Sequence, residues 1–251
     1  MRHLHHTDHH FPPPFHFGLA TAPAHSEDHL DDAWLAFAQQ GHVKAWRNTP
    51  RPRERLRAYT EPRVDIDLAI ATGISLYRTG VDWGRLVPNC SLDADDASRC
   101  AIQDERALAQ YARTLGYVKS RGLKVMLTLF HHSFPKWGVY PQRSVREPGA
   151  AAVGEFGPGG AATGLMWHHP NAVKLFITFA ADVERRLGHL VDYWVVFNEP
   201  VVFTTLTHCL GIWPPGPRVD DVAVQLNCIT NRNTGALRAQ IQMARAHRGF
   251  V

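Results

Sequence analysis

The chain has 251 residues, 45% of them hydrophobic and 20% charged, which is the composition of a soluble globular protein with a substantial core. Its formal net charge is +4, and the positive residues crowd only between Arg47 and Arg57, a stretch that we interpret as a solvated loop rather than a patch for nucleic acid or a membrane surface. No apolar run is long enough to span a membrane, and we see no secretory signal peptide at the start of the chain.

The chain opens on residues 1–14, which are rich in histidine and end in three prolines. This composition indicates a disordered leader, and a metal-binding tail is the alternative interpretation. Folded structure is expected from residue 15 onward. The first predicted elements are a strand over 15–20, a helix over 31–40, a loop over 50–62 and a helix over 64–72 that ends at Gly73.

The central part of the chain gives the clearest periodic patterns. Residues 74–81 read as a strand, and residues 104–121 as a helix that ends at Gly122. Residues 123–130 are almost continuously apolar, as expected for a strand buried on both faces. The predicted helix has one apolar face at helical spacing, made by Leu108, Tyr111, Leu115 and Val118.

After this comes a segment rich in glycine, alanine and proline, residues 147–164, which we expect to be mobile. Asn171 is the predicted cap of a further helix that closes at Gly188. A strand over 193–197 and a last helix over 234–248 follow. The apolar face predicted for the capped helix consists of Val173, Phe176, Ala180, Val183 and Leu187.

Strands and helices thus alternate through four successive pairs. Such alternation is typical of parallel strands joined by helical crossovers, either in a doubly wound sheet or in a (β/α) barrel. No glycine-rich phosphate loop follows any strand, which disfavours dinucleotide and P-loop proteins. The four cysteines (Cys90, Cys100, Cys209 and Cys228) lack CxxC spacing, so we expect neither a metal site nor a disulfide framework.

Polar residues gather at the predicted strand ends, where enzymes of these folds place their chemistry. Glu199 is the strongest candidate, because it follows an apolar strand in an Asn-Glu-Pro setting. A carboxyl group there could protonate a leaving glycosidic oxygen, and Asn198 beside it could hold a substrate hydroxyl. The other strand-end candidates are His25, Glu27 and Asp28, then Arg78, Asp82, Trp83 and Arg85, then His131 and His132.

Several of these residues also have a purely structural interpretation. Arg78 could be a structural ion-pair partner, and Glu27 could cap or pair locally. His131 could be a satisfied core histidine, and for His132 the core interpretation is favoured. Trp83 and Trp194 are interpreted as core residues rather than sugar platforms.

Four segments, in order, resemble glycoside hydrolase family 1, the β-glucosidase family. Residues 15–22 (FHFGLATA) resemble its opening FxFGxATA motif, and residues 77–88 (YRTGVDWGRLVP) resemble YRFSISWxRILP. Residues 127–135 (LTLFHHSFP) resemble VTLYHWDLP, and residues 197–200 are the FNEP motif. The resemblance covers nearly the whole chain from residue 15 and implies a (β/α)8 TIM-barrel fold, of which this chain would supply about the first four βα units.

The resemblance also implies roles for single residues and no cofactor or metal. Glu199 would be the general acid/base of a retaining β-glycosidase. Asn198 would bind the sugar 2-hydroxyl, and His25 and His131 would bind the sugar ring on the glycone side. Arg78 would steady the nucleophile carboxylate.

Two positions depart from the common family pattern, since His25 stands for a glutamine and His132 for the tryptophan of the HW pair. With residues 31–34 and 211–214, both departures resemble the sensitive-to-freezing branch of the family. That branch implies galactolipid:galactolipid galactosyl transfer, a galactolipid substrate, peripheral membrane contact and the chloroplast outer envelope. A plain soluble β-glucosidase acting on other β-glycosides, in the cytoplasm, is the alternative.

The second catalytic carboxylate is not expected in this chain. A retaining enzyme needs a nucleophile about 5 Å from the acid/base, and no TENG-type motif follows Glu199. Glu155 lies in the glycine-rich segment and is a poor substitute. A half-barrel would also expose two strand edges. The remaining alternative is therefore an inactive half-barrel that binds sugar or a partner protein.

Overall fold

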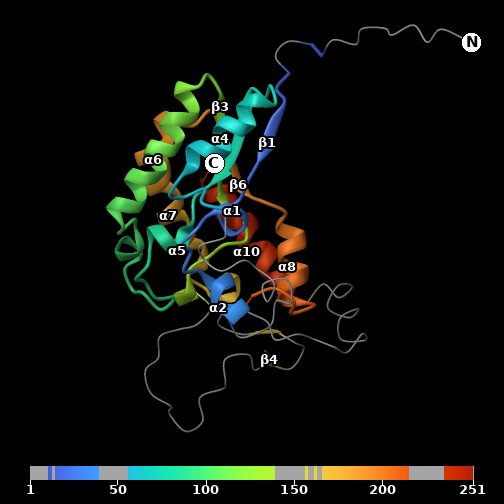
Figure 1. Ribbon diagram of the computed structural model, residues 1–251. Coiled ribbons are helices and arrows are strands. Elements are labelled where there is room, and N and C mark those ends of the chain that lie inside the picture. Colours follow the sequence, from blue (N-terminus) through green and yellow to red (C-terminus); the bar gives the residue numbers. More distant parts are fainter. Residues whose placement is uncertain are drawn as a thin grey trace, which may run out of the picture.

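A computed structural model describes residues 11–12, 15–39, 56–138, 156–157, 161–162, 166–214 and 235–250 (Figure 1). Most of the predicted leader and of the predicted mobile segment 147–164 lie outside the described residues. The centre of the molecule is a four-stranded sheet in the order β1-β2-β3-β6, with all neighbouring strands parallel. The strands are β1 (Gly18–Ala20), β2 (Leu76–Gly80), β3 (Lys124–Phe130) and β6 (Tyr193–Phe197).

Helices connect these strands and cover the outer face of the sheet (Figure 1). A separate two-stranded antiparallel pair, β4 (Phe156–Gly157) and β5 (Ala161–Ala162), stands apart from the main sheet. The helices are α1 (Pro23–Ser26), α2 (Ala33–Gln39), α4 (Pro62–Ala71), α5 (Trp83–Leu86), α6 (Glu105–Ser120), α7 (Ala172–Leu187), α8 (Pro200–His208) and α10 (Gly235–Phe250). Short 3-10 turns are η2 (Ala97–Cys100), η3 (Lys136–Gly138), η4 (Met166–His168) and η5 (Gly188–Leu190).

The core lies between the sheet and helices α6 and α7. On β3, Val125, Leu127 and Leu129 are buried, as its continuous apolar sequence predicted. Trp83 is fully buried and stacks on Phe179 of α7, with ring centroids 5.2 Å apart. The interpretation of Trp83 as a core residue is therefore confirmed.

Helix α6 forms for the reasons visible in its sequence. Asp104 accepts hydrogen bonds from the backbone N–H groups of Arg106 and Ala107, and so satisfies donors of the first turn. Gly122 follows the helix with φ of +81°, a left-handed conformation that favours glycine. All four residues of the predicted apolar face are buried.

Helix α7 departs from the prediction at its start. Asn171 has helical backbone angles and makes no capping bond to the helix; its side-chain amide donates to the Leu92 carbonyl oxygen at 2.9 Å. Val173 is only partly buried, whereas Leu175 and Phe179 complete the inner face. A contact with the distant loop thus replaced the local cap that the sequence suggested.

The expectation that the cysteines form no disulfides is wrong. Cys90 and Cys100 are bonded to each other, with Cα atoms 5.4 Å apart, and Cys209 is also disulfide-bonded. The segment between Cys90 and Cys100 folds back so that Leu92 and Ala97 are buried. That fold-back, which a spacing rule does not detect, brings the two sulfur atoms together.

The two outer strands each have one unpaired edge within the described residues, because β1 pairs only with β2 and β6 only with β3. Exposed aromatic residues lie beside β1, where Phe11, Phe15 and Phe17 form a cluster with ring centroids 4.4 to 5.0 Å apart. Tyr193 at the start of β6 is 42% exposed. Both outer edges of the four-stranded sheet are therefore unpaired in the part of the chain that the structure describes.

Candidate active site

Parallel pairing aligns the carboxyl ends of the central strands. Phe130 of β3 lies opposite Phe197 of β6, and the Asn198 N–H donates to the Phe130 carbonyl oxygen at 2.9 Å. His131 and Asn198, the next residue on each strand, therefore emerge at the same level. This is the edge at which parallel α/β folds gather functional side chains.

Arg78 extends from β2 toward this edge. Its Nε donates to Thr128 Oγ1 on β3 at 2.9 Å, and its Nη2 donates to the Asn198 side-chain oxygen at 2.7 Å. These bonds fix the Asn198 amide so that its NH₂ group faces away from the guanidinium. Thr128 was not identified from the sequence, because it lies within an apolar strand and has no motif of its own.

Glu199 follows Asn198 and precedes the first turn of α8. Its backbone is left-handed, with φ of 43° and ψ of 57°, and its exposed side chain makes no capping hydrogen bond. A non-glycine residue in this region carries strain, and such residues concentrate at functional sites. The charge of Glu199 favours the protonated states of Arg78 and His132, which places its carboxylate within electrostatic reach of both.

His131 and His25 face each other with ring centroids 5.8 Å apart. His25 is exposed, whereas the Nδ1 atom of His131 is buried and has no hydrogen-bond partner in the described part of the chain. Burial, followed by the charges of His132, Arg78 and His25, lowers the pKa of His131 to about 3. His131 is thus neutral at neutral pH, and its buried Nδ1 lacks a hydrogen-bond partner among the described residues.

His132 is 6% exposed, in agreement with its core interpretation. Its Nε2 lies 3.0 Å from the Asn198 carbonyl oxygen, and its ring packs on Trp213 at 4.7 Å and on Phe203. The Trp34 indole N–H donates to the His132 carbonyl oxygen at 2.7 Å. His132 therefore links β3 to β6.

We call five residues at this edge of the sheet the mouth cluster. They are His25, Arg78, His131, Asn198 and Glu199.

Comparison with known proteins finds similarity to one family. The profile of "Glycosyl hydrolase family 1" matches residues 162–248. The chain is 32% identical over 286 aligned positions to "Beta-glucosidase-like SFR2, chloroplastic" of Oryza sativa subsp. japonica, with 83% of this chain and 40% of that protein covered. It is 33% identical to "Galactolipid galactosyltransferase SFR2, chloroplastic" of Arabidopsis thaliana, with 80% and 36% covered. The chain is thus similar to glycosyl hydrolase family 1 proteins over about four fifths of its length.

Solved structures of family 1 enzymes have the same fold as this chain. The family 1 β-glucosidase of Thermotoga maritima in complex with isofagomine lactam superposes with a TM-score of 0.69 at 21% identity, over 96% of this chain and 45% of that one. The predicted TIM-barrel class is confirmed, and the four parallel strands are part of such a barrel. The chain spans about 40% of the length of the curated relatives that it matches.

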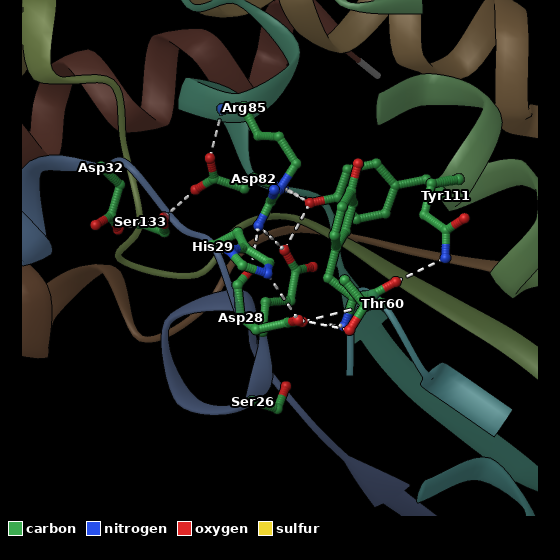
Figure 2. A network of polar contacts seen from close by, with 12 residues as sticks. Ser26, Asp28, His29, Asp32, Thr60, Asp82, Arg85, Tyr111 and Ser133 are labelled. Atoms are coloured by element: carbon green, nitrogen blue, oxygen red, sulfur yellow. Dashed lines mark hydrogen bonds and ion pairs between the residues drawn. The ribbon is translucent and has the colours of Figure 1, made fainter. Parts of the chain in front are cut away.

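A second group of polar residues forms a network of hydrogen bonds and ion pairs (Figure 2), and its carboxyl groups are buried. Arg85 donates to Glu27 Oε2 at 3.2 Å and to the Asp28 carbonyl oxygen at 2.7 Å, and its guanidinium lies over the Tyr59 ring. The Tyr111 hydroxyl donates to Glu27 Oε2 at 3.0 Å. We call this group the buried acid network. It consists of Glu27, Asp28, Asp32, Asp82, Arg85, Tyr111 and Ser133.

Two carboxyl groups of this network meet at one hydroxyl group. Ser133 Oγ lies 2.7 Å from Asp32 Oδ2 and is also hydrogen-bonded to Asp82 Oδ2. Contrary to one interpretation of the sequence, Glu27 does not pair locally, because its partners Arg85 and Tyr111 are 58 and 84 residues away. Ser133, Tyr111 and Asp32 were not identified as members of a polar network, because their partners lie up to 101 residues away.

The structure gives no sign of a metal centre in the part of the chain that it describes, where no three His, Cys, Asp or Glu residues are arranged to hold an ion. None of the helices placed by the structure has the length and apolar character needed to cross a bilayer.

Proposed function

We propose that this chain supplies the acid/base side of a retaining β-glycosyl-transfer site, with Glu199 as the general acid and base. The observation that carries the proposal is the placement of Glu199. Glu199 has a left-handed backbone and an exposed side chain. It lies at the strand-end edge of a barrel of the family 1 fold, next to Asn198, whose side chain is hydrogen-bonded to Arg78. In such a reaction one carboxyl group protonates the leaving oxygen and then deprotonates the acceptor.

The other members of the mouth cluster would hold the sugar. The Asn198 oxygen is occupied by Arg78, so its NH₂ group is available to donate to a sugar hydroxyl. Neutral His131 has an unpartnered Nδ1 that can accept or donate a hydrogen bond. His25 is exposed beside it. Arg78 would place a positive charge beneath the sugar, where it can steady the second carboxylate.

The nucleophile would come from the remaining part of the barrel. The retaining mechanism needs a second carboxylate about 5 Å from the first. Three carboxyl groups that follow the other strands, those of Glu27, Asp32 and Asp82, are buried and bonded within the acid network. Glu155 lies outside the described residues. We therefore assign the nucleophile to the strands that the matched relatives possess beyond their aligned part.

A finer proposal concerns the sugar and its acceptor. Both relatives that carry the SFR2 name are at least 32% identical to this chain, and one is named a galactolipid galactosyltransferase. We propose that the complete protein transfers a β-galactosyl group from one galactolipid to a second. The nucleophile would displace the lipid alkoxide, which Glu199 protonates, and an acceptor sugar hydroxyl would then displace the nucleophile while Glu199 takes its proton.

This substrate would require contact with a membrane surface. Both relatives are named chloroplastic, which supports a chloroplast location, and we propose the outer envelope as the specific site.

The test is complementation. The 251-residue chain is purified alone and also with the carboxyl-terminal part of the Arabidopsis relative, and both preparations are assayed on an aryl β-glucoside and on monogalactosyl lipid. We expect no turnover by the chain alone and turnover by the mixture. Glu199→Gln should reduce this turnover by about 10²- to 10⁴-fold. Full activity of the Glu199→Gln mixture would refute the acid/base assignment.

The same assay separates the alternatives. Faster turnover of the aryl glucoside than of the galactolipid would favour a plain β-glucosidase. No turnover in any mixture, together with measurable sugar binding by the chain, would favour the inactive half-barrel. That outcome has its own support, since both outer strands keep an unpaired edge within the described residues.

A further inference from the structure

In the bridge formed by Asp32, Ser133 and Asp82, two carboxyl oxygen atoms contact a hydroxyl group that has a single proton to donate. Ser133 Oγ is hydrogen-bonded to Oδ2 of both aspartates, and all three side chains are buried. A serine hydroxyl carries one proton and can donate to only one of them. The other oxygen–oxygen contact is a hydrogen bond only if that carboxyl group itself carries a proton.

The remaining contacts of the two aspartates supply no compensating charge. Asp82 accepts from the backbone N–H of Arg85 at 2.5 Å, and Asp32 accepts from that of Leu35 at 2.9 Å. Both are helix-capping bonds from neutral donors. They orient the carboxyl groups but leave any negative charge on them unpaired in a buried position, which is costly.

The charged groups around the bridge are mostly acidic. The Arg85 guanidinium, from α5, is bonded to Glu27 and to the Asp28 carbonyl oxygen. The segment after β1 contributes Glu27, Asp28, Asp31 and the exposed His29, which lies 3.6 Å from Asp28; Asp31 is paired with Lys136, which follows β3. The ionisable hydroxyls that face the network are those of Tyr111 on α6 and Tyr59 before α4. Among the described residues, the Arg85 guanidinium is thus bonded to Glu27 and Asp28 and forms no ion pair with either bridge aspartate, although its charge opposes the rise in the pKa of Asp82.

We propose that Asp32 and Asp82 bind one shared proton at neutral pH, and that this buried proton site fastens the segment after β1 to the ends of β2 and β3. Asp32 forms an isolated antiparallel bridge with Pro135, and the Ala33 N–H donates to the Phe134 carbonyl oxygen at 3.0 Å. Asp82 lies between β2 and α5, whose first turn it caps, and is on the other side of the bridge (Figure 2). The proton would replace a repulsion between two buried carboxylates by a continuous hydrogen-bonded chain.

The electrostatics agree with this geometry. Burial, followed by the charge of Asp82, raises the pKa of Asp32 to about 7. Burial also raises the pKa of Asp82. The proposal does not depend on sugar transfer, because neither aspartate belongs to the mouth cluster.

The proposal is tested by the pH dependence of unfolding of the full chain. A group whose pKa is higher in the folded state than in the unfolded state releases its proton on unfolding, so its stabilisation is complete below about pH 4 and is lost as the pH rises toward the folded value of about 7. Each released proton makes the unfolding constant rise tenfold per pH unit. We therefore compare how the logarithm of the unfolding constant changes with pH between pH 5 and pH 6.5. The slope of Asp32→Asn should be smaller than that of the wild type by one, which is a factor of ten per pH unit.

Asp31→Asn is the matched control, because Asp31 is adjacent in sequence but is an exposed partner of Lys136. Its slope should equal that of the wild type. An equal slope for wild type and Asp32→Asn would overturn the proposal, as would stabilisation of the wild type by Ca²⁺ or Mg²⁺ that Asp32→Asn abolishes, since the pair would then be a cation site.

A second readout does not depend on reversible unfolding. In the wild-type chain labelled with ¹³C at aspartate carboxyl groups, we expect one resonance with the shift of a protonated acid at pH 6 that is absent from Asp32→Asn. Glutamate is not labelled, so Glu27 cannot contribute to this signal. A spectrum in which every aspartate is ionised at pH 6 would overturn the proposal.

Discussion

Two clusters of polar residues lie at the same ends of the same strands, and they differ in how completely their hydrogen bonds are satisfied. The buried acid network bonds its carboxyl groups internally, to Arg85, Tyr111, Ser133 and backbone N–H groups. The mouth cluster keeps free capacity, in the exposed Glu199 and in Nδ1 of His131.

This difference separates the residues that stabilise the fold from the residues that can bind a ligand. Buried carboxyl groups that bond to neighbouring segments fix the strand-end loops in place, although the buried Nε of Arg85 has no partner among the described residues. Polar groups that lack a hydrogen-bond partner in the protein are the ones to which a ligand can supply one. The following predictions test this division, from the largest expected effect to the smallest.

Removal of the two strand-end arginines should have unequal effects on stability. Arg85→Met should lower the free energy of unfolding by about 3 kcal/mol, because it removes a buried donor from the Asp28 carbonyl oxygen and leaves Glu27 with Tyr111 as its donor. Arg78→Met should cost about 1 kcal/mol, since its partners Thr128 and Asn198 lie at the open edge. Urea unfolding at pH 7 measures both, and equal losses would refute the division. Arg106→Leu, at an exposed position on α6, is the control.

Glu27 should make stability depend on pH. Burial raises its pKa to about 8, against the opposing effect of Arg85, so the folded protein retains a proton that the unfolded chain releases. Its contribution is complete below about pH 4.5 and is lost as the pH rises toward 8, by up to about 1.4 kcal/mol per pH unit. Thermal unfolding of Glu27→Gln between pH 5 and 8 should show a flatter profile than the wild type. A profile parallel to that of the wild type would contradict the assignment.

His131→Phe should leave stability unchanged or raise it by up to about 1 kcal/mol, because it keeps an aromatic ring and removes a buried nitrogen without a partner. Sugar binding by the completed protein should nevertheless fall. A loss of stability of several kcal/mol would show that His131 is a structural member of the core and not a site for ligand.

Glu199→Gly should raise stability by a few tenths of a kcal/mol, since glycine adopts the left-handed backbone at φ of 43° without strain but gives up more entropy on folding. Glu199→Gln keeps the strain and should leave the free energy of unfolding unchanged. Destabilisation by both variants would place Glu199 among the structural residues.

The sequence predicted the parallel strands and the helices α6 and α7 because their apolar patterns are local and regular. It predicted the mouth cluster because Asn198, Glu199 and His131 stand directly after strands in recognisable motifs. Those roles remain predictions, whereas the positions are now placed in space.

What the sequence could not reveal are contacts between distant segments. Asp32 and Ser133 are 101 residues apart, and Arg78 and Asn198 are 120 apart, so no periodic pattern links them. The Cys90–Cys100 disulfide and the contact of Asn171 with Leu92 likewise depend on how one loop folds back on α7. Each of these features is a consequence of tertiary structure and not of local propensity.

The most direct test of the acid/base assignment varies the leaving group. In the complemented enzyme, rates of wild type and Glu199→Gln are compared on one aryl glycoside whose leaving group needs no protonation and on one alkyl glycoside that does. We predict that the first bond-breaking step is almost unaffected by the substitution for the first substrate and falls by about 10²-fold or more for the second. An equal reduction for both leaving groups would contradict the account, because Glu199 would then not be the residue that protonates the glycosidic oxygen.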